Sequence, residues 1–178
     1  MTGVRGRDHR SAGEAEAVAS GGWLRTVRRY FVAIAFGNIA WETAQLPLYT
    51  IWHQGSAREI VFAVVHCTGG DLLVAGAALF GTLLVIGNKD WPFVRFRAVA
   101  AITLLIGLAY TMFSEWLNTE IRGSWAYTDF MPTLPLIGTG ISPLLQWILV
   151  PMAGFWWARR PFAAAGISAQ ARRIVGIS

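Results

Sequence analysis

Charged residues are scarce in this chain. Of its 178 residues, 14% are Asp, Glu, Lys or Arg, against about 25% in an average soluble protein. Nine of the 25 charges lie in the first 29 residues and four in the last 20, which leaves 12 for the 129 residues between. Over the whole chain, 54% of the residues are hydrophobic. This composition excludes a disordered protein, a coiled coil and a disulfide scaffold. It also argues against an ordinary soluble domain and predicts an all-α integral membrane protein.

Cysteine, histidine and the common catalytic motifs are also scarce or missing. A single cysteine, Cys67, excludes an intramolecular disulfide. The chain has three histidines and no His-Glu-x-x-His pattern, no phosphate-binding glycine loop with its lysine, and no Gly-x-Ser-x-Gly turn. These absences exclude the best-known zinc hydrolases, P-loop nucleotide hydrolases and serine esterases. The net charge of +5 does not indicate nucleic acid as a partner, because the arginines lie in tails and short loops beside apolar segments.

Four long apolar segments are present, at about residues 30–52, 60–86, 98–117 and 143–158. A helix needs about 20 apolar residues to cross the hydrocarbon core of a bilayer. The sequence therefore predicts a four-helix transmembrane bundle that occupies residues 23–160. Residues 1–22 are rich in Gly, Ala, Ser, Glu and Arg, and we expect a disordered cytoplasmic tail there. Residues 161–178 are expected to form a second cytoplasmic tail.

The positions of lysine and arginine predict the orientation of this bundle. With four spans, 13 of the 15 basic residues fall on the side of the two termini, and only Arg58 and Arg122 fall on the other. Basic residues are enriched in cytoplasmic loops. We therefore expect both termini in the cytoplasm and a location in a bacterial inner membrane, with membrane lipid as the first partner.

The loop between the third and fourth spans has an unusual composition for a solvated linker. Residues 118–142 contain three aromatic side chains, Trp125, Tyr127 and Phe130, together with two prolines and several glycines. Proline and glycine at this density exclude a long helix, while the aromatic rings favour packing on other parts of the protein. We expect an ordered loop that covers the outer, periplasmic end of the bundle.

Polar side chains inside the spans are the strongest indication of function. Asn38, Glu42 and Gln45 are spaced i, i+4, i+7, so they share one helix face. Thr111, Glu115 and Asn118 repeat that spacing in the third span, while the second span has His66, Cys67 and Asp71 and the fourth has Gln146 and Trp147. All of these residues fall in the outer half of the predicted bundle. A charged side chain at the centre of a bilayer costs about 2.5–3.5 kcal/mol or more, so we expect these groups to cluster in the interior.

This cluster predicts a site for a membrane-soluble apolar ligand, such as an isoprenoid, a quinone or a lipid. In it, Glu42, Asp71 and Glu115 are the candidate catalytic carboxyls, and His66 is a candidate proton shuttle or ligand. Carboxylic acids that keep their protons in an apolar pocket are good general acids. The candidate ligand-binding residues are Asn38, Trp41, Gln45, Asn118, Tyr127, Gln146 and Trp147.

Other interpretations of the same residues stay open. Polar side chains also bond across transmembrane interfaces and stabilise them by about 0.6–2 kcal/mol each. A metal site would use Glu42, His66, Asp71 and Glu115, one nitrogen and three oxygen ligands. The sequence identifies no cofactor. The alternative functions are a non-catalytic assembly subunit of a larger membrane complex, which implies a membrane partner or a homo-oligomer, and a component that transports protons or metal ions.

One segment resembles part of a known family. Residues 125–132 have the sequence WAYTDFMP, followed by Leu134-Pro135, Pro143 and Trp147. Over about 35 residues, from Glu115 to Pro151, this pattern resembles a segment of the membrane-embedded carotenoid hydratase family. That family also has an acid upstream, a Tyr-Thr pair, and spaced Pro and Trp. Its members are larger and have more spans, so the resemblance covers this segment alone and does not assign the activity.

Overall fold

The computed structural model describes the backbone of residues 5–88 and 90–175, and the side chains of residues 22–88 and 90–160. Within these ranges the chain is helical and contains no β-strand. The long helices are α1 (Arg5–Gln45), α3 (Ala57–Ile86), α4 (Phe96–Trp116) and α5 (Ile141–Val175). The short elements are η1 (Leu46–Leu48), α2 (Ile51–Gln54) and η2 (Leu117–Ile121), the last with π-helical hydrogen bonding.

Three of the described helical segments are long and apolar enough to cross a membrane. They are Ala57–Ile86, Phe96–Ile121 and Ile141–Arg160. At 1.5 Å per residue, each of them reaches or exceeds the roughly 30 Å thickness of a hydrocarbon core. These helices confirm an all-helical protein with the character of a membrane protein. Helix α1 is not among them, and its described part carries Arg25, Arg28, Arg29 and Glu42.

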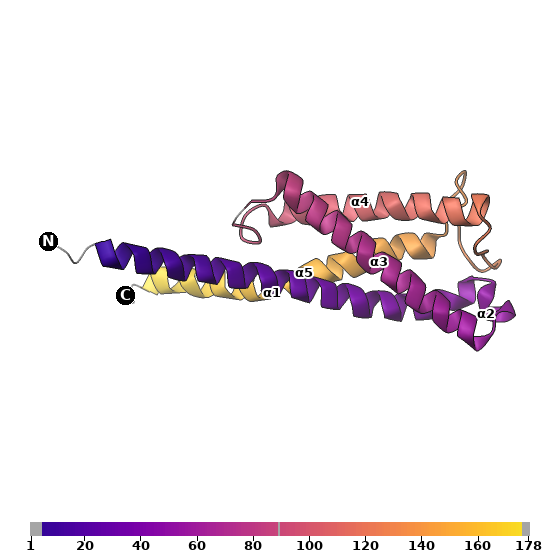
Figure 1. The fold of residues 1–178 in the computed structure, drawn as a ribbon, viewed down its shortest axis with the longest axis horizontal. Coiled ribbons are helices and arrows are strands. Elements are labelled where there is room, and N and C mark those ends of the chain that lie inside the picture. Colours follow the sequence, from indigo (N-terminus) through magenta and orange to yellow (C-terminus); the bar gives the residue numbers. More distant parts are fainter. Residues whose placement is uncertain (1–4, 89, 176–178) are drawn as a thin grey trace.

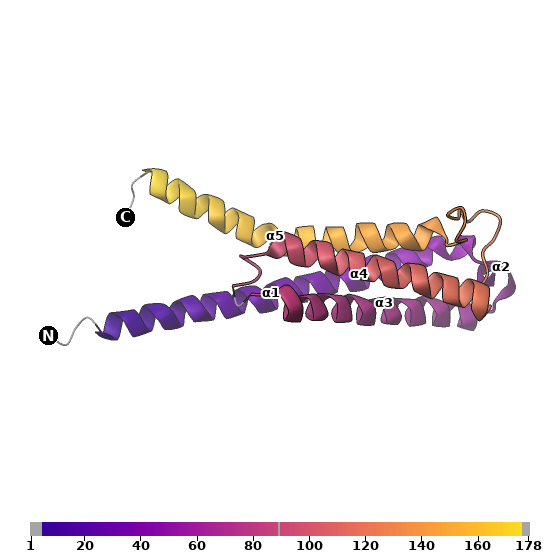
Figure 2. The same cartoon turned by 90° about the horizontal axis from the view of Figure 1, so that it is seen from above.

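The long helices pack side by side. Helix α1 contacts α3 and α5, and α4 contacts the same two helices from the other side. Helix α1 starts and α5 ends at the same end of the molecule, whereas η1, α2 and residues 122–140 gather at the opposite end (Figures 1 and 2). We refer to this second end as the loop end. Helices α3 and α4 diverge as they approach it (Figure 1).

Local sequence explains where α1 ends and α3 begins. Pro47 lies in the first turn of η1, and because proline has no N–H and clashes with the preceding turn, the α-helix ends at Gln45. The predicted first span, 30–52, therefore overruns the helix by about two turns, since apolar composition continues past the break. Ser56 begins α3 with a capping box, in which its hydroxyl accepts from Glu59 N and Glu59 Oε2 accepts from Ser56 N at 2.8 Å.

The other predicted segments agree closely with the helices. Segments 60–86 and 98–117 correspond to Ala57–Ile86 and Phe96–Trp116, and 143–158 lies inside Ile141–Val175. The tails differ from expectation. Helix α1 already begins at Arg5, and α5 continues to Val175, because the Ala, Glu and Arg residues of these segments favour a helix. The expected tail residues 1–4 and 176–178 lie outside the described residues.

Away from the loop end, the core is filled with aromatic and aliphatic side chains. Tyr30 and Phe155 are buried with ring centroids 4.4 Å apart, and Phe96 packs edge-on against Phe155. Trp91, from the connection between α3 and α4, is 2% exposed and stacks on Phe96. The interior of this half of the bundle is closed, so a site inside the bundle has to lie nearer the loop end.

Candidate functional site

One buried amide joins α1, α3 and α5. Gln146 of α5 is 2% exposed. Its Nε2 donates to Asn38 Oδ1 at 3.2 Å, to Glu42 Oε1 at 2.9 Å and to Asp71 Oδ2 at 3.0 Å. An amide nitrogen has two hydrogens, so three oxygens share two donors. Residues of α1 and α3 thus share one donor group on α5.

The same network continues toward the loop end. Gln45 Nε2 donates to Gln146 Oε1 at 3.2 Å, and Ser142 Oγ donates to Gln45 Oε1 at 2.8 Å. Trp41 Nε1 then donates to Ser142 Oγ at 3.2 Å. All three residues of the i, i+4, i+7 set on α1 therefore meet the same residue of α5, as their shared face predicts.

Asp71 is held from a second side by Trp147. The indole Nε1 donates to Asp71 Oδ1 at 3.2 Å, so each carboxyl oxygen of Asp71 accepts one N–H. Trp147 reaches this position because Gly107 lies beneath its ring. A Cβ added at Gly107 would lie 2.2 Å from Trp147 Cζ3, closer than any ordinary contact. A glycine on α4 thereby sets the position of an indole on α5.

Glu115 belongs to a second polar group. It is 7% exposed on α4 and accepts a hydrogen bond from the Tyr127 hydroxyl, which itself accepts from Gly140 N at 3.1 Å. Burial, together with the bond to Glu115 and its negative charge, raises the pKa of the Tyr127 phenol above its ordinary value. Tyr127 is therefore a neutral hydrogen-bond donor across the physiological range.

Backbone hydrogen bonds fasten residues 122–140 to the segment after α1. Thr50 N donates to Ala126 O at 2.9 Å, and Thr128 N donates to Leu48 O at 3.0 Å. Within the segment, Leu134 N donates to Thr139 O at 2.8 Å, and Ile141 N, at the start of α5, donates to Pro132 O at 2.7 Å. These bonds give a region without helix a defined path across the ends of the helices.

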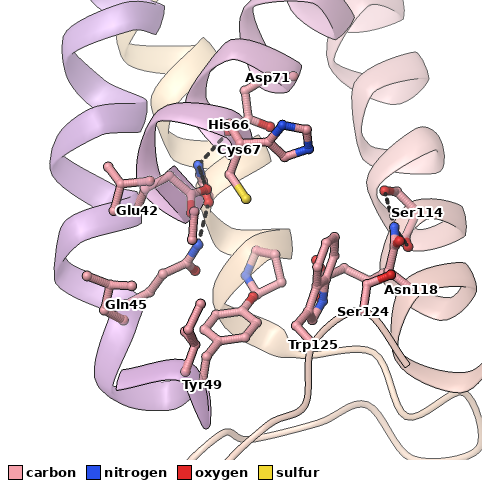
Figure 3. A pocket seen from close by; sticks show the side chains of 18 of the residues that line it. Glu42, Gln45, Tyr49, His66, Cys67, Asp71, Ser114, Asn118, Ser124 and Trp125 are labelled. Carbon is pink, nitrogen blue, oxygen red and sulfur yellow. Dashed lines mark hydrogen bonds between the residues drawn. The ribbon is translucent and has the colours of Figure 1, made fainter. Parts of the chain in front are cut away.

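A cavity of about 850 Å³ lies between these two polar groups. Glu42 and Gln45 of α1 face Ser114 of α4 and Asn118 of η2 across it, while His66, Cys67 and Asp71 come from α3 (Figure 3). Glu115, Gln146 and Trp147 also line it. The cavity thus brings together the four candidate catalytic residues and part of the predicted ligand-binding set.

The cavity reaches the surface of the protein between α3 and α4. Its lining includes Phe62 on α3, which is 66% exposed, and Tyr110 on α4, which is 49% exposed. Gly70, also on the lining, is exposed and has no other atom near the position of a Cβ. Both helices belong to candidate membrane spans. The opening is therefore flanked by apolar surface on the α3 and α4 side, whereas exposed Gln54, Glu59 and Arg122 line it toward the loop end.

The remaining predicted residues have diverse positions. His66 is exposed at the opening, and its ring stacks on Phe62 with centroids 5.3 Å apart. Asn118 lines the cavity and donates to Ser114 O at 2.8 Å. Asn38, Trp41 and Tyr127 are not on the lining. Asn38 and Tyr127 bond to the lining residues Gln146 and Glu115, whereas Trp41 bonds to Ser142, which in turn bonds to the lining residue Gln45.

A metal centre finds no support in this geometry. Among the described residues, no three His, Cys, Asp or Glu side chains are close enough together to hold a metal ion. Glu42, His66, Asp71 and Glu115 share a cavity but do not converge on one point. The four residues that the sequence offered as possible metal ligands are therefore dispersed around the walls of the cavity.

Sequence reasoning missed some of the site. Ser142 links two predicted residues, and Tyr49 lines the cavity beside Gln45. Ser142 is four residues before Gln146, which is a helical spacing that could have indicated it. Tyr49 follows the break at Pro47, where helical periodicity gives no indication of direction.

No family model, curated protein or solved structure matches the chain. A proposal about its function therefore depends on the geometry of the site.

Proposed function

We propose that the protein is a four-span membrane protein that binds a membrane-soluble ligand, an isoprenoid, quinone or lipid, in the cavity between α3 and α4. Acid–base chemistry at Glu42, Asp71 and Glu115 would act on its polar group. The observation that carries this proposal is a cavity with carboxyls inside that reaches the surface beside Phe62 and Tyr110, on two candidate membrane spans. A ligand dissolved in the bilayer could enter sideways without crossing water.

The four-span arrangement rests on α1 lying alongside α3 and α5. From Tyr30 to Trp41, α1 carries no charged residue, and Arg25, Arg28 and Arg29 would lie at the membrane surface. The bias of 13 basic residues against 2 supports cytoplasmic termini in a bacterial inner membrane. In this orientation the loop end faces the periplasm, and residues 122–140 cover that end of the bundle.

The partners of the acids support a role in chemistry. Within the described part of the chain, Glu42, Asp71 and Glu115 accept from an amide, an indole and a phenol, and no lysine or arginine bonds to them. Carboxyls at membrane depth without a cation are costly unless they carry protons or meet a polar ligand. Such groups can donate a proton to a carbonyl or alkene, or take one from a hydroxyl. His66 at the opening would exchange that proton with the outer side.

The closed half of the core favours this proposal over transport. Tyr30, Leu79, Trp91 and Phe155 are each at most 4% exposed and belong to one packed cluster. A carrier of protons or ions needs a polar route to both membrane faces, whereas this cavity serves one side.

The test uses the protein released from its own membrane with native lipid and studied by native mass spectrometry. We expect a bound small mass on the wild type, and its loss in Glu42→Gln and Asp71→Asn. Reconstitution with a prenylated benzoquinone or a prenyl alcohol then asks which class restores the bound mass.

Asp129→Asn is the matched control, because Asp129 is exposed and does not line the cavity. It should keep the ligand. Folded Glu42→Gln and Asp71→Asn variants that retain the wild-type mass, or a wild type that binds neither probe, would refute the proposal. Unfolding of both variants in mild detergent would instead show that the acids serve helix packing.

A further inference from the structure

A second hollow lies between α1 and α5, whereas the cavity with the acids opens between α3 and α4. Its volume is about 540 Å³, and it shares no lining residue with the cavity that holds the acids. Small side chains form its floor, namely Ala33, Gly37, Ala40, Ala44 and Ala153. Larger side chains form its walls, namely Trp41, Leu149, Val150, Trp156 and Trp157. We call this hollow the α1/α5 groove.

The groove is open to the surroundings and almost wholly apolar. Ala40, Ala44 and Ala153 are exposed, as are Leu149 and Trp156. From residue 33 to residue 44 it follows about 16 Å of α1 at 1.5 Å per residue. That length equals about half of a 30 Å hydrocarbon core, which is the depth that the chains of one leaflet occupy.

Positive charge is concentrated at one end of the groove. The Arg160 guanidinium lies 3.5 Å from the centre of the Trp156 ring, and that of Arg29 lies 5.5 Å from the centre of the Trp157 ring. Both rings are walls of the groove. A guanidinium over an aromatic face is held in place by the ring and keeps N–H groups free to bind phosphate.

We propose that the α1/α5 groove binds one anionic phospholipid. An acyl chain lies against the alanines, and the phosphate lies between Arg29 and Arg160. The charge at one end selects this occupant over a neutral apolar helix, because two fixed guanidinium groups beside an apolar channel complement an anionic head with an apolar tail. The inference is independent of the ligand in the acidic cavity.

The test is a native mass spectrometry titration of the full-length protein in detergent. Phosphatidylglycerol is compared with phosphatidylcholine that carries the same acyl chains. We expect the wild type to retain phosphatidylglycerol about tenfold better. Arg29→Gln and Arg160→Gln should each weaken that retention about fivefold, the effect of one basic side chain near an anionic lipid surface.

Arg97→Gln is the matched charge control, since Arg97 is an exposed arginine on α4 and does not contact the groove. It should leave the preference unchanged. Ala40→Leu fills the floor at an exposed position and should weaken retention of both lipids. Equal retention of the two lipids, an Arg97→Gln effect as large as that of Arg29→Gln, or a second copy of the chain in place of lipid would overturn the proposal.

Discussion

Glu42 of α1 and Asp71 of α3 accept hydrogen bonds from one nitrogen, Nε2 of Gln146, at 2.9 and 3.0 Å. The two acids are far apart in the sequence and on different helices, yet one amide of α5 fixes their relative position. Buried acceptors that lose their donor pay the full cost of desolvation. Gln146 is therefore the residue on which the polar interior depends most.

Replacing Gln146 with leucine should destabilise the protein by about 1–3 kcal/mol, because several buried oxygens lose a donor while the volume hardly changes. The measurement is the free energy of unfolding in a detergent mixture. Leu145→Ala, at an exposed neighbour on the same helix, should have a smaller effect. Equal effects from the two substitutions would show that the amide network adds no stability.

A methyl group at Gly107 should be poorly tolerated. Its position lies 2.2 Å from the buried Trp147 ring, whose Nε1 bonds to Asp71, so the ring cannot move without losing that bond. We expect Gly107→Ala to destabilise the protein by about 1–3 kcal/mol. Gly81→Ala is the control, since no atom lies within 4 Å of its Cβ position, and greater helix propensity should make it neutral or stabilising. Thermal unfolding of the two variants distinguishes these outcomes, and a harmless Gly107→Ala would contradict the close helix approach.

The bond between Tyr127 and Glu115 should make stability depend on pH at the alkaline end. Because the pKa of Tyr127 is raised on folding, its contribution is fully present below the unfolded value of about 10 and is lost as pH rises through the folded value. Tyr127→Phe should be less stable than the wild type at neutral pH, and the difference should shrink above pH about 10. Tyr110→Phe, at an exposed position, is the control. A difference that grows with rising pH would contradict the assigned sign.

Cys67 can report on the opening between α3 and α4, because it is the only cysteine in the chain and lines the cavity. We expect an apolar maleimide to label it in membranes. Gly70→Leu, which places a side chain on the lining, should slow that labelling several-fold. Gly69→Leu provides a close control, because Gly69 is exposed, has open space at its Cβ position and does not line the cavity. Equal labelling rates for the two variants would place the entry elsewhere.

Periodicity predicted the polar faces well because helical geometry is local. The spacing of Asn38, Glu42 and Gln45 was sufficient to place them on one face, and all three meet Gln146. Apolar composition likewise located α3, α4 and the start of α5 within a few residues. The end of α1 was harder, since apolar composition continues to residue 52 while Pro47 stops the helix.

Composition and spacing by themselves determined that the chain is helical and has the character of a membrane protein. They also determined which side chains are costly to expose to lipid. Each of these three conclusions follows from residues that are neighbours along a single helix. The tertiary structure decided what those side chains do to one another. It placed Gln146 among three oxygens, brought Tyr127 from a loop to Glu115, spread the weighed metal ligands around a wall and separated α3 from α4 at the loop end. These relationships depend on the distances and angles between helices. Close contacts, such as that of Gly107 with Trp147, set those distances and angles, and no local sequence pattern encodes them.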